Sequence, residues 1–154
     1  MTRAFLLRLL AFGLLTFGAA GLGSMFTARG LGPWYDGLAK PSWTPPGAVI
    51  GTVWTVLFAL VAVASALVWQ AGRPAAYTAV LIANLTLNVL WSYLFFARRN
   101  PAAAFNDLFV LELSCIVLVV LAAPLSRGAA LLLLPYPAWV AFAGFLNRTI
   151  VRMN

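Results

Sequence analysis

Long apolar stretches alternate with short polar connectors along the whole chain. Five of these stretches reach the roughly 20 residues that an α-helix needs to cross the hydrocarbon core of a bilayer. They cover approximately residues 4–26, 48–69, 77–96, 102–123 and 129–150. Only the connectors and the chain ends lie outside them. The pattern therefore predicts an all-α membrane protein, in which residues 1–154 form one domain of five transmembrane helices.

Composition and charge support this interpretation. The chain has 154 residues, of which 64% are hydrophobic and 8% are charged, whereas about a quarter of the residues of a soluble domain are charged. The net charge of +7 comes from basic residues that are scattered through connectors and ends. Such charges are typical of membrane-flanking segments. We expect the lipid bilayer, and no nucleic acid, as the partner of these charges.

The basic residues also predict an orientation. Five crossings place the two termini on opposite sides of the membrane, with four basic residues on the N-terminal side and six on the other. The four are Arg3, Arg8, Arg73 and Arg127, and the six are Arg29, Lys40, Arg98, Arg99, Arg148 and Arg152. Cytoplasmic segments carry the excess of Lys and Arg. The C-terminus is therefore expected in the cytoplasm.

The third stretch carries polar side chains on one helical face. Asn84, Asn88, Trp91 and Ser92 follow one another at i, i+4, i+7 and i+8, a spacing that aligns them along the helix. Polar groups in hydrocarbon cost free energy, so this face must point into the bundle. Two interpretations remain open, namely hydrogen bonds between helices and the wall of a ligand cavity.

Two other stretches offer matching aromatic faces. Trp54 and Phe58 are four residues apart in the second stretch, and so are Trp139 and Ala143 in the fifth, which Leu146 extends. The fifth face follows two prolines in the sequence PYPAW, which should bend or loosen the helix. Aromatic residues at this spacing fit either core packing or a ligand cavity, and the position of the tryptophans within the stretches favours a cavity.

Two carboxylates lie in the fourth stretch, and no histidine occurs in the chain. Asp107 and Glu112 are five residues apart, which separates them by about 140° around a helix and argues against a paired acid site. Glu112 falls near the middle of its stretch, where we expect it to be protonated or bonded to a neighbouring helix. It is also the residue that favours a proton-coupled transporter. Without histidine, histidine-based triads and metal sites are excluded, and we expect no metal site.

The first connector is unusually rich in aromatic residues and prolines. Residues 34–47 read WYDGLAKPSWTPPG. Pro45 and Pro46 favour a stiff, extended backbone, and the segment also carries Trp34, Tyr35 and Trp43. This loop, over residues 27–46, is expected to act as a structured lid on the open end of the bundle. Anchoring at the membrane interface, for which tryptophan and tyrosine are suited, is the alternative.

These segments together resemble a known family. The loop sequence, then VWTVLF, NLTLNVLWSYLFFARRN and LLPYPAWVAFAGFLN, are similar to the signature of the TspO/MBR family, which includes bacterial tryptophan-rich sensory proteins and mitochondrial translocator proteins. The resemblance covers residues 34–147. It implies a five-helix bundle, usually a homodimer, in a bacterial cell membrane. It also implies a cavity beneath the first loop for protoporphyrin IX, other tetrapyrroles or sterols, with no further cofactor.

The resemblance also implies a set of site residues. The ligand cavity would be lined by Tyr35, Trp54, Phe58, Asn84, Asn88, Trp91, Ser92, Trp139, Ala143 and Leu146. Trp54 and Asn88 would donate hydrogen bonds to a ligand carbonyl. Trp139, with Tyr35, corresponds to positions tied to light- and oxygen-dependent porphyrin breakdown, and both are catalytic candidates only if such breakdown occurs. Lys40 or Arg29 would meet the porphyrin carboxylates at the mouth.

Three functions follow from these features. The first is a tetrapyrrole receptor or sensor, and the second is an enzyme that degrades porphyrin by photo-oxidation, since no residues for conventional catalysis are evident. The third is a small secondary transporter of tetrapyrroles, sterols or other amphipathic molecules that uses Glu112. Free-base porphyrin is favoured over haem because no axial ligand is clearly placed. Cholesterol transport is not transferred, because Arg148 interrupts the corresponding motif in FLNRTIVR.

Overall fold

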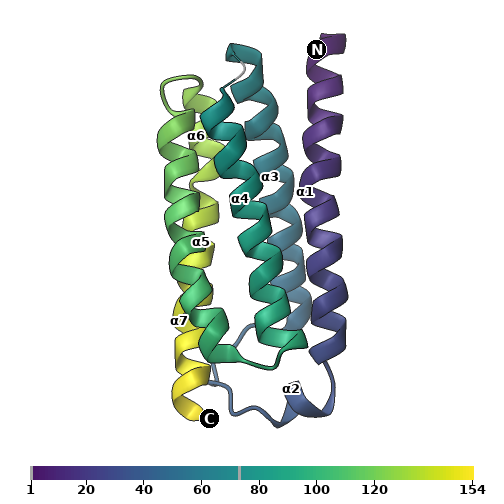
Figure 1. Cartoon of the computed structure of the whole chain (residues 1–154), viewed down its shortest axis with the longest axis vertical. Helices are drawn as coiled ribbons and strands as arrows, with labels where there is room; N and C mark the ends of the chain where they lie inside the picture. Colours follow the sequence, from purple (N-terminus) through teal and green to yellow (C-terminus); the bar gives the residue numbers. More distant parts are fainter. Residues whose placement is uncertain (1, 73) are drawn as a thin grey trace.

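The computed structural model describes residues 2–72 and 74–154 and shows an antiparallel helical bundle (Figure 1). Five helical segments are long and apolar enough to cross a membrane, as the sequence predicts, and the described residues form no strand. The two termini lie at opposite ends of the bundle. Arg73, one of the basic residues counted on the N-terminal side, lies outside the described residues.

The helices extend slightly beyond the predicted boundaries. Their bounds are α1 Arg3–Gly30, α2 Pro33–Gly37, α3 Gly47–Ala71, α4 Ala75–Ser92, η1 Tyr93–Ala97, α5 Pro101–Ala122, α6 Arg127–Leu133 and α7 Pro135–Met153. Because α1 continues to Gly30, the first loop begins at residue 31 rather than 27. This loop also contains a short helix, α2, that the sequence pattern did not predict.

The fifth membrane segment is broken at Leu134, between α6 and α7. The prolines of PYPAW explain this break, since a proline lacks a backbone donor and begins α7. The helix α6 packs against α3 and α5, whereas α7 packs mainly against α5. Beyond the break, α3 and α7 therefore separate, in the half of the bundle that holds the first loop and the C-terminus. We call this half the loop half; it is the lower half in Figure 1.

The helix α1 contacts different partners along its length. In the upper half, Phe12 packs edge-on against Trp69 of α3, with ring centroids 5.6 Å apart. In the loop half, α1 lies against α4 and η1, where a Cβ atom at Gly23 would meet Ser92 and one at Gly30 would meet Phe96. Small residues at these two positions allow the close approach of the helix backbones.

The fourth helix ends in one turn of π-helix, η1, closed by a hydrogen bond of 2.8 Å from the Arg98 backbone N–H to the Tyr93 carbonyl. Arg99 then takes a left-handed conformation, with φ of 51°. The Asn100 side chain accepts a hydrogen bond from the Ala103 N–H and caps α5. The wider π turn changes the direction of the side chains that follow it and places Phe95 and Phe96 in the interior.

The first loop is attached to the bundle at several points. Trp34 and Tyr35 pack against phenylalanines of η1, and Trp43 stacks on Phe145 of α7, with ring centroids 5.3 Å apart. Asn154 donates to the Ala39 carbonyl and accepts from the Ala39 N–H, each at 3.0 Å. The loop crosses the end of the bundle in Figure 1. Its function as a lid stays a prediction.

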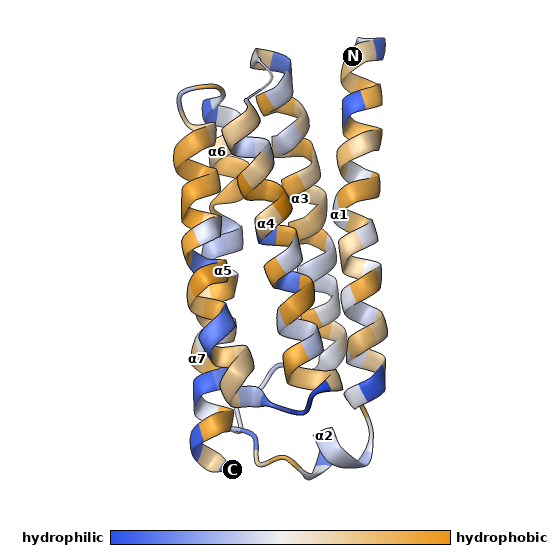
Figure 2. Ribbon diagram, viewed as in Figure 1, coloured by the Kyte–Doolittle hydropathy of each residue, from blue (hydrophilic) through white to orange (hydrophobic). Residues whose placement is uncertain are grey.

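Hydrophobic residues make up most of the membrane segments, and the connectors carry a larger share of hydrophilic residues (Figure 2). Large side chains such as Leu14, Phe109 and Leu131 are more than half exposed. Such an apolar belt suits the hydrocarbon of a bilayer. The protein is a multi-pass integral membrane protein.

Candidate functional site: a cavity in the loop half of the bundle

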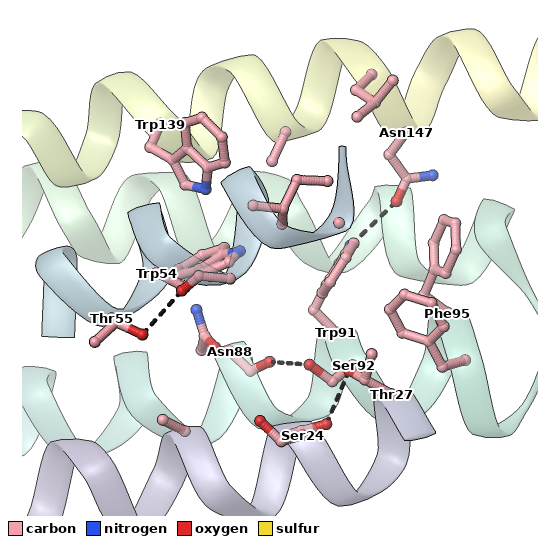
Figure 3. A pocket seen from close by; sticks show the side chains of 18 of the residues that line it. Ser24, Thr27, Trp54, Thr55, Asn88, Trp91, Ser92, Phe95, Trp139 and Asn147 are labelled. Atoms are coloured by element: carbon pink, nitrogen blue, oxygen red, sulfur yellow. Dashed lines mark hydrogen bonds between the residues drawn. The ribbon is translucent and has the colours of Figure 1, made fainter. Parts of the chain in front are cut away.

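A cavity of about 390 Å³ lies in the loop half of the bundle (Figure 3). Its walls come from α1, α3, α4, η1, α7 and the first loop, and none of the residues that line it is charged. The separation of α7 from α3 beyond the Pro135 break creates this space. The volume lies within the range of small-molecule sites, and the uncharged walls select for a ligand whose buried part is neutral.

Aromatic rings form the wall between α3 and α7. The Trp54 ring lies 5.7 Å from Phe58 and 6.5 Å from Trp139, between ring centroids. Phe142 lies 5.2 Å from Trp139. Because α7 begins at Pro135, its Trp139 indole lies edge to face against the Trp54 indole of α3. The resulting surface suits a flat apolar ligand.

Two polar groups of the cavity, one on α7 and one on α4, have hydrogen-bonding capacity to spare. The Trp139 Nε1–H is buried, and no group among the described residues accepts it; it points into the cavity in Figure 3. The Asn88 amide donates one long hydrogen bond of 3.4 Å to the Tyr136 hydroxyl, which leaves its second N–H free. A buried donor without an acceptor costs about 1–3 kcal/mol. A ligand acceptor placed here would remove that cost.

Hydroxyl groups from three helices, α1, α3 and α4, also line the cavity. Thr27, Thr55 and Ser92 line the cavity, and each donates its proton to a backbone carbonyl of its own helix, at 3.0, 2.9 and 3.5 Å. Because their protons are used in this way, the oxygens present lone pairs to the cavity. The cavity thus offers both hydrogen-bond donors and hydrogen-bond acceptors.

Asn84 lies outside the cavity, contrary to its predicted position in the cavity wall. It is fully buried, and its amide donates to Ser114 Oγ at 2.8 Å and Cys115 Sγ at 3.2 Å. Its carbonyl accepts from the Tyr136 hydroxyl at 2.9 Å. The reason is depth: one turn farther from the loop than Asn88, the space is filled by Tyr136. The polar face of α4 therefore combines both interpretations, with Asn84 joining helices and Asn88 facing the cavity.

Trp91 contributes its ring but not its N–H. The indole Nε1 donates to Asn147 Oδ1 at 3.1 Å, and the Asn147 amide donates to the Pro101 carbonyl at 2.8 Å. Asn147 also lines the cavity and connects α4, α5 and α7. This arrangement fixes the plane of Trp91 and leaves its face for stacking.

Tyr35 reaches the cavity from the first loop. Its ring packs against Phe96 and under the Lys40 ammonium group. Burial, followed by the neighbouring Asp36 carboxylate, raises the pKa of Tyr35 above its ordinary value. The phenol is therefore neutral at physiological pH, and a charge does not form at this end of the cavity.

The predicted cationic contacts lie elsewhere. Lys40 donates to the carbonyls of Tyr35 and Leu38, and the exposed Arg29 lies over the Phe26 ring. Neither residue lines the cavity. A porphyrin carboxylate would have to extend beyond the uncharged walls to reach either of them.

The two carboxylates of α5 are also separate from the cavity. Asp107 and Glu112 each have one buried oxygen without a hydrogen-bond partner among the described residues, but neither lines the cavity. Transport that uses Glu112 therefore stays a prediction to which this cavity adds no support.

A sequence model of the TspO/MBR family matches residues 11–153. The chain belongs to this family. It is 37% identical over 151 residues to the tryptophan-rich protein TspO of Archaeoglobus fulgidus, an alignment that covers 97% of this chain and 98% of the relative. The uncharacterized membrane protein YtaB of Bacillus subtilis is 43% identical over 125 residues, covering 79% and 80%. The human translocator protein is 37% identical over 126 residues, covering 79% and 75%.

Nine of the ten residues that the TspO/MBR resemblance implied for the site line this one cavity, and Asn84 is the exception. Their role in binding a ligand stays a prediction. The sequence interpretation missed the contribution of α1, which supplies Ala20, Gly23, Ser24 and Thr27. The spacing of these small and hydroxyl residues could have indicated a helical face, but none of them has the chemistry that marks a site by itself. It also missed Phe95 and Phe96, because their orientation depends on the π turn.

Proposed function

We propose that this member of the TspO/MBR family is a membrane receptor or sensor that binds a tetrapyrrole, with protoporphyrin IX as the reference ligand. The observation that carries the proposal is that an uncharged aromatic cavity holds the Trp139 N–H, which has no acceptor among the described residues, and a spare N–H of Asn88. The rings of Trp54, Phe58 and Trp91 suit the faces of a porphyrin macrocycle.

The free-base macrocycle fits these walls better than an ionised ligand. Its ring is apolar and uncharged, and none of the side chains that line the cavity is charged. Its carboxylates belong outside, because an uncharged cavity within the bilayer provides no compensation for a buried charge. We therefore propose that the carboxylate edge points toward the end of the cavity that lies under the first loop.

The test is a titration with protoporphyrin IX in the dark, followed by the porphyrin absorption band so that removing a tryptophan does not alter the signal. Trp139→Phe deletes the free indole donor and Asn88→Ala removes the amide with its spare donor, and we expect each to weaken binding by about 2- to 10-fold, the equivalent of about 0.5–1.5 kcal/mol. Thr86→Ala, on the exposed face of α4, is the control. Unsaturable spectral change that is identical in all four proteins would contradict the proposal.

A second function, photo-oxidative breakdown of the bound porphyrin, is favoured by the placement of Trp139 and Tyr35 on one cavity. The edge-on contact of Trp139 with Trp54 provides a neighbouring ring over which an oxidised indole can share its charge. Illumination of the bound complex in air should bleach the porphyrin faster than in protein-free detergent. Trp139→Phe, compared at equal porphyrin occupancy, should remove this acceleration. Bleaching by the wild-type protein that is no faster than in detergent would contradict the breakdown function, and equal acceleration in both proteins would exclude a role for Trp139.

A further inference from the structure

The side wall of the cavity between α1 and α3 is open. Gly47, Gly51 and Thr55, at i, i+4 and i+8 of α3, line the cavity and are nevertheless exposed. None of residues 47–56 is buried, whereas the buried residues of α3 all lie between positions 57 and 68. A Cβ atom at Gly47 or Gly51 would meet nothing within 4 Å. The loop half of α3 therefore lacks a neighbour on this side.

The path of α1 explains the opening. In the upper half α1 packs against α3 through Phe12 and Trp69. In the loop half it packs instead against α4 and η1, through Gly23 on Ser92, Phe26 on Tyr93 and Gly30 on Phe96. Ser24 of α1 lines the cavity while remaining exposed. The two helices thus diverge where the cavity lies.

Unlike the side between α1 and α3, the end of the cavity nearest to water is covered by the first loop. Tyr35 and Leu31 line it there, and the first loop is held by Trp43 on α7 and by the two hydrogen bonds between Asn154 and Ala39. The side opening belongs to two helices that are long and apolar enough to span the membrane. It therefore faces the bilayer.

We propose that the ligand enters and leaves through this lateral portal, defined by Ser24, Gly47, Gly51 and Thr55, directly from the hydrocarbon of the membrane. The portal is uncharged and is bordered by glycines and hydroxyls, so the apolar ring of a flat amphipathic molecule can pass it while the ionised groups of that molecule stay at the membrane interface beside the first loop. The ligand class is then an amphipathic planar molecule that already partitions into the bilayer. For porphyrin, this inference rests on the proposed function.

The experiment narrows the portal in steps, with Gly51→Ala, Gly51→Val and Gly51→Phe. The same three substitutions at Gly21 are the control, because Gly21 is an exposed glycine of α1 with nothing within 4 Å of its Cβ position and lies outside the cavity. Association and dissociation rates of protoporphyrin IX are measured in phosphatidylcholine nanodiscs. We expect both rates to fall with side-chain size at position 51, by about tenfold for phenylalanine, and to stay at the wild-type values at position 21.

A loop variant tests the competing route. Asn154→Ala removes the hydrogen bonds to Ala39 and loosens the first loop. The lateral portal predicts unchanged rates in this variant. If Asn154→Ala accelerates both rates while the Gly51 series matches the Gly21 series, the ligand passes under the loop and the portal is overturned.

A second readout does not depend on porphyrin. A nitroxide spin label on Ala143→Cys, inside the cavity, is prepared in a Cys115→Ser background. The portal predicts stronger collisional relaxation by oxygen, which concentrates in the bilayer, than by a water-soluble nickel chelate, and a loss of the oxygen effect in Gly51→Phe. Stronger relaxation by nickel would overturn it. If the wild-type protein binds no porphyrin, the proposed function fails, and the spin label still decides on the portal.

Discussion

At the scale of single residues, the buried hydrogen bonds around Tyr136 should contribute measurably to stability. Tyr136→Phe removes the donor to Asn84 Oδ1 and the acceptor of the Asn88 amide. Interhelical hydrogen bonds in membranes contribute about 0.6 kcal/mol on average, so we expect a loss of about 1 kcal/mol. The measurement is unfolding in mixed micelles by increasing sodium dodecyl sulfate. Thr86→Val, whose hydroxyl bonds only to Ile82 of its own helix, is the control and should change little.

Tyr35 should report the environment of the first loop by its titration. Burial raises its pKa above 10.0, and the Asp36 carboxylate adds to the shift. The packed loop is therefore fully stabilised below pH 10.0, and this contribution is lost as the pH rises through the elevated pKa. The difference in phenolate absorbance between wild type and Tyr35→Phe isolates this group. In Asp36→Asn the pKa should fall but stay elevated, since burial is the larger cause; a pKa at 10.0 in the wild type would contradict the packing.

The individual site residues show what a sequence pattern can decide. Helical spacing correctly aligned Asn84 and Asn88 on one face of α4, because both point into the bundle. Spacing says nothing about what fills the space opposite each residue. Tyr136 occupies it at the level of Asn84, and the cavity occupies it at the level of Asn88. Depth along a helix depends on the partner helix, which a single sequence does not place.

At the scale of elements, the junction of α1 with η1 depends on Gly30. A Cβ atom there would lie 2.6 Å from the Phe96 carbonyl oxygen, so Gly30→Ala should push α1 and η1 apart at a cost of about 1–3 kcal/mol. Gly21→Ala, in open space on the same helix, should instead be neutral or stabilising by up to about 1 kcal/mol. Micelle unfolding of both variants is the measurement. If Gly30→Ala and Gly21→Ala stabilise the protein equally, the close contact of α1 with η1 does not limit the size of residue 30.

The five membrane helices were predictable because bilayer thickness and hydrophobicity fix their length and number. The Pro135 break was predictable too, since proline removes a backbone donor. The π turn of η1 and the short α2 were not, because both arise from packing of the first loop and α1 rather than from local hydropathy. Phe95 and Phe96, which enter the cavity through that π turn, were missed for the same reason.

At the scale of the whole molecule, two separations of helices create the site. The broken fifth segment moves α7 away from α3, and in the loop half α1 lies against α4 and η1 while Gly47, Gly51 and Thr55 of α3 stay exposed. The first separation opens the cavity, and the second opens its side toward lipid. Both occur in the loop half, where the first loop covers the end. The upper half, where α6 returns to α3, keeps a continuous core.

The orientation of the bundle provides the final prediction. The termini lie at opposite ends, and the excess of six basic residues on the loop side over four on the other predicts that the first loop and the C-terminus lie in the cytoplasm. Green fluorescent protein fused after Asn154 should fluoresce, and alkaline phosphatase at the same point should be inactive. Replacing Arg98 and Arg99 with glutamine leaves four basic residues on each side, so this variant should insert in both orientations and show both activities. An active phosphatase fusion on the wild-type chain would reverse the predicted orientation and put the first loop, with the end of the cavity beneath it, on the outer side of the membrane.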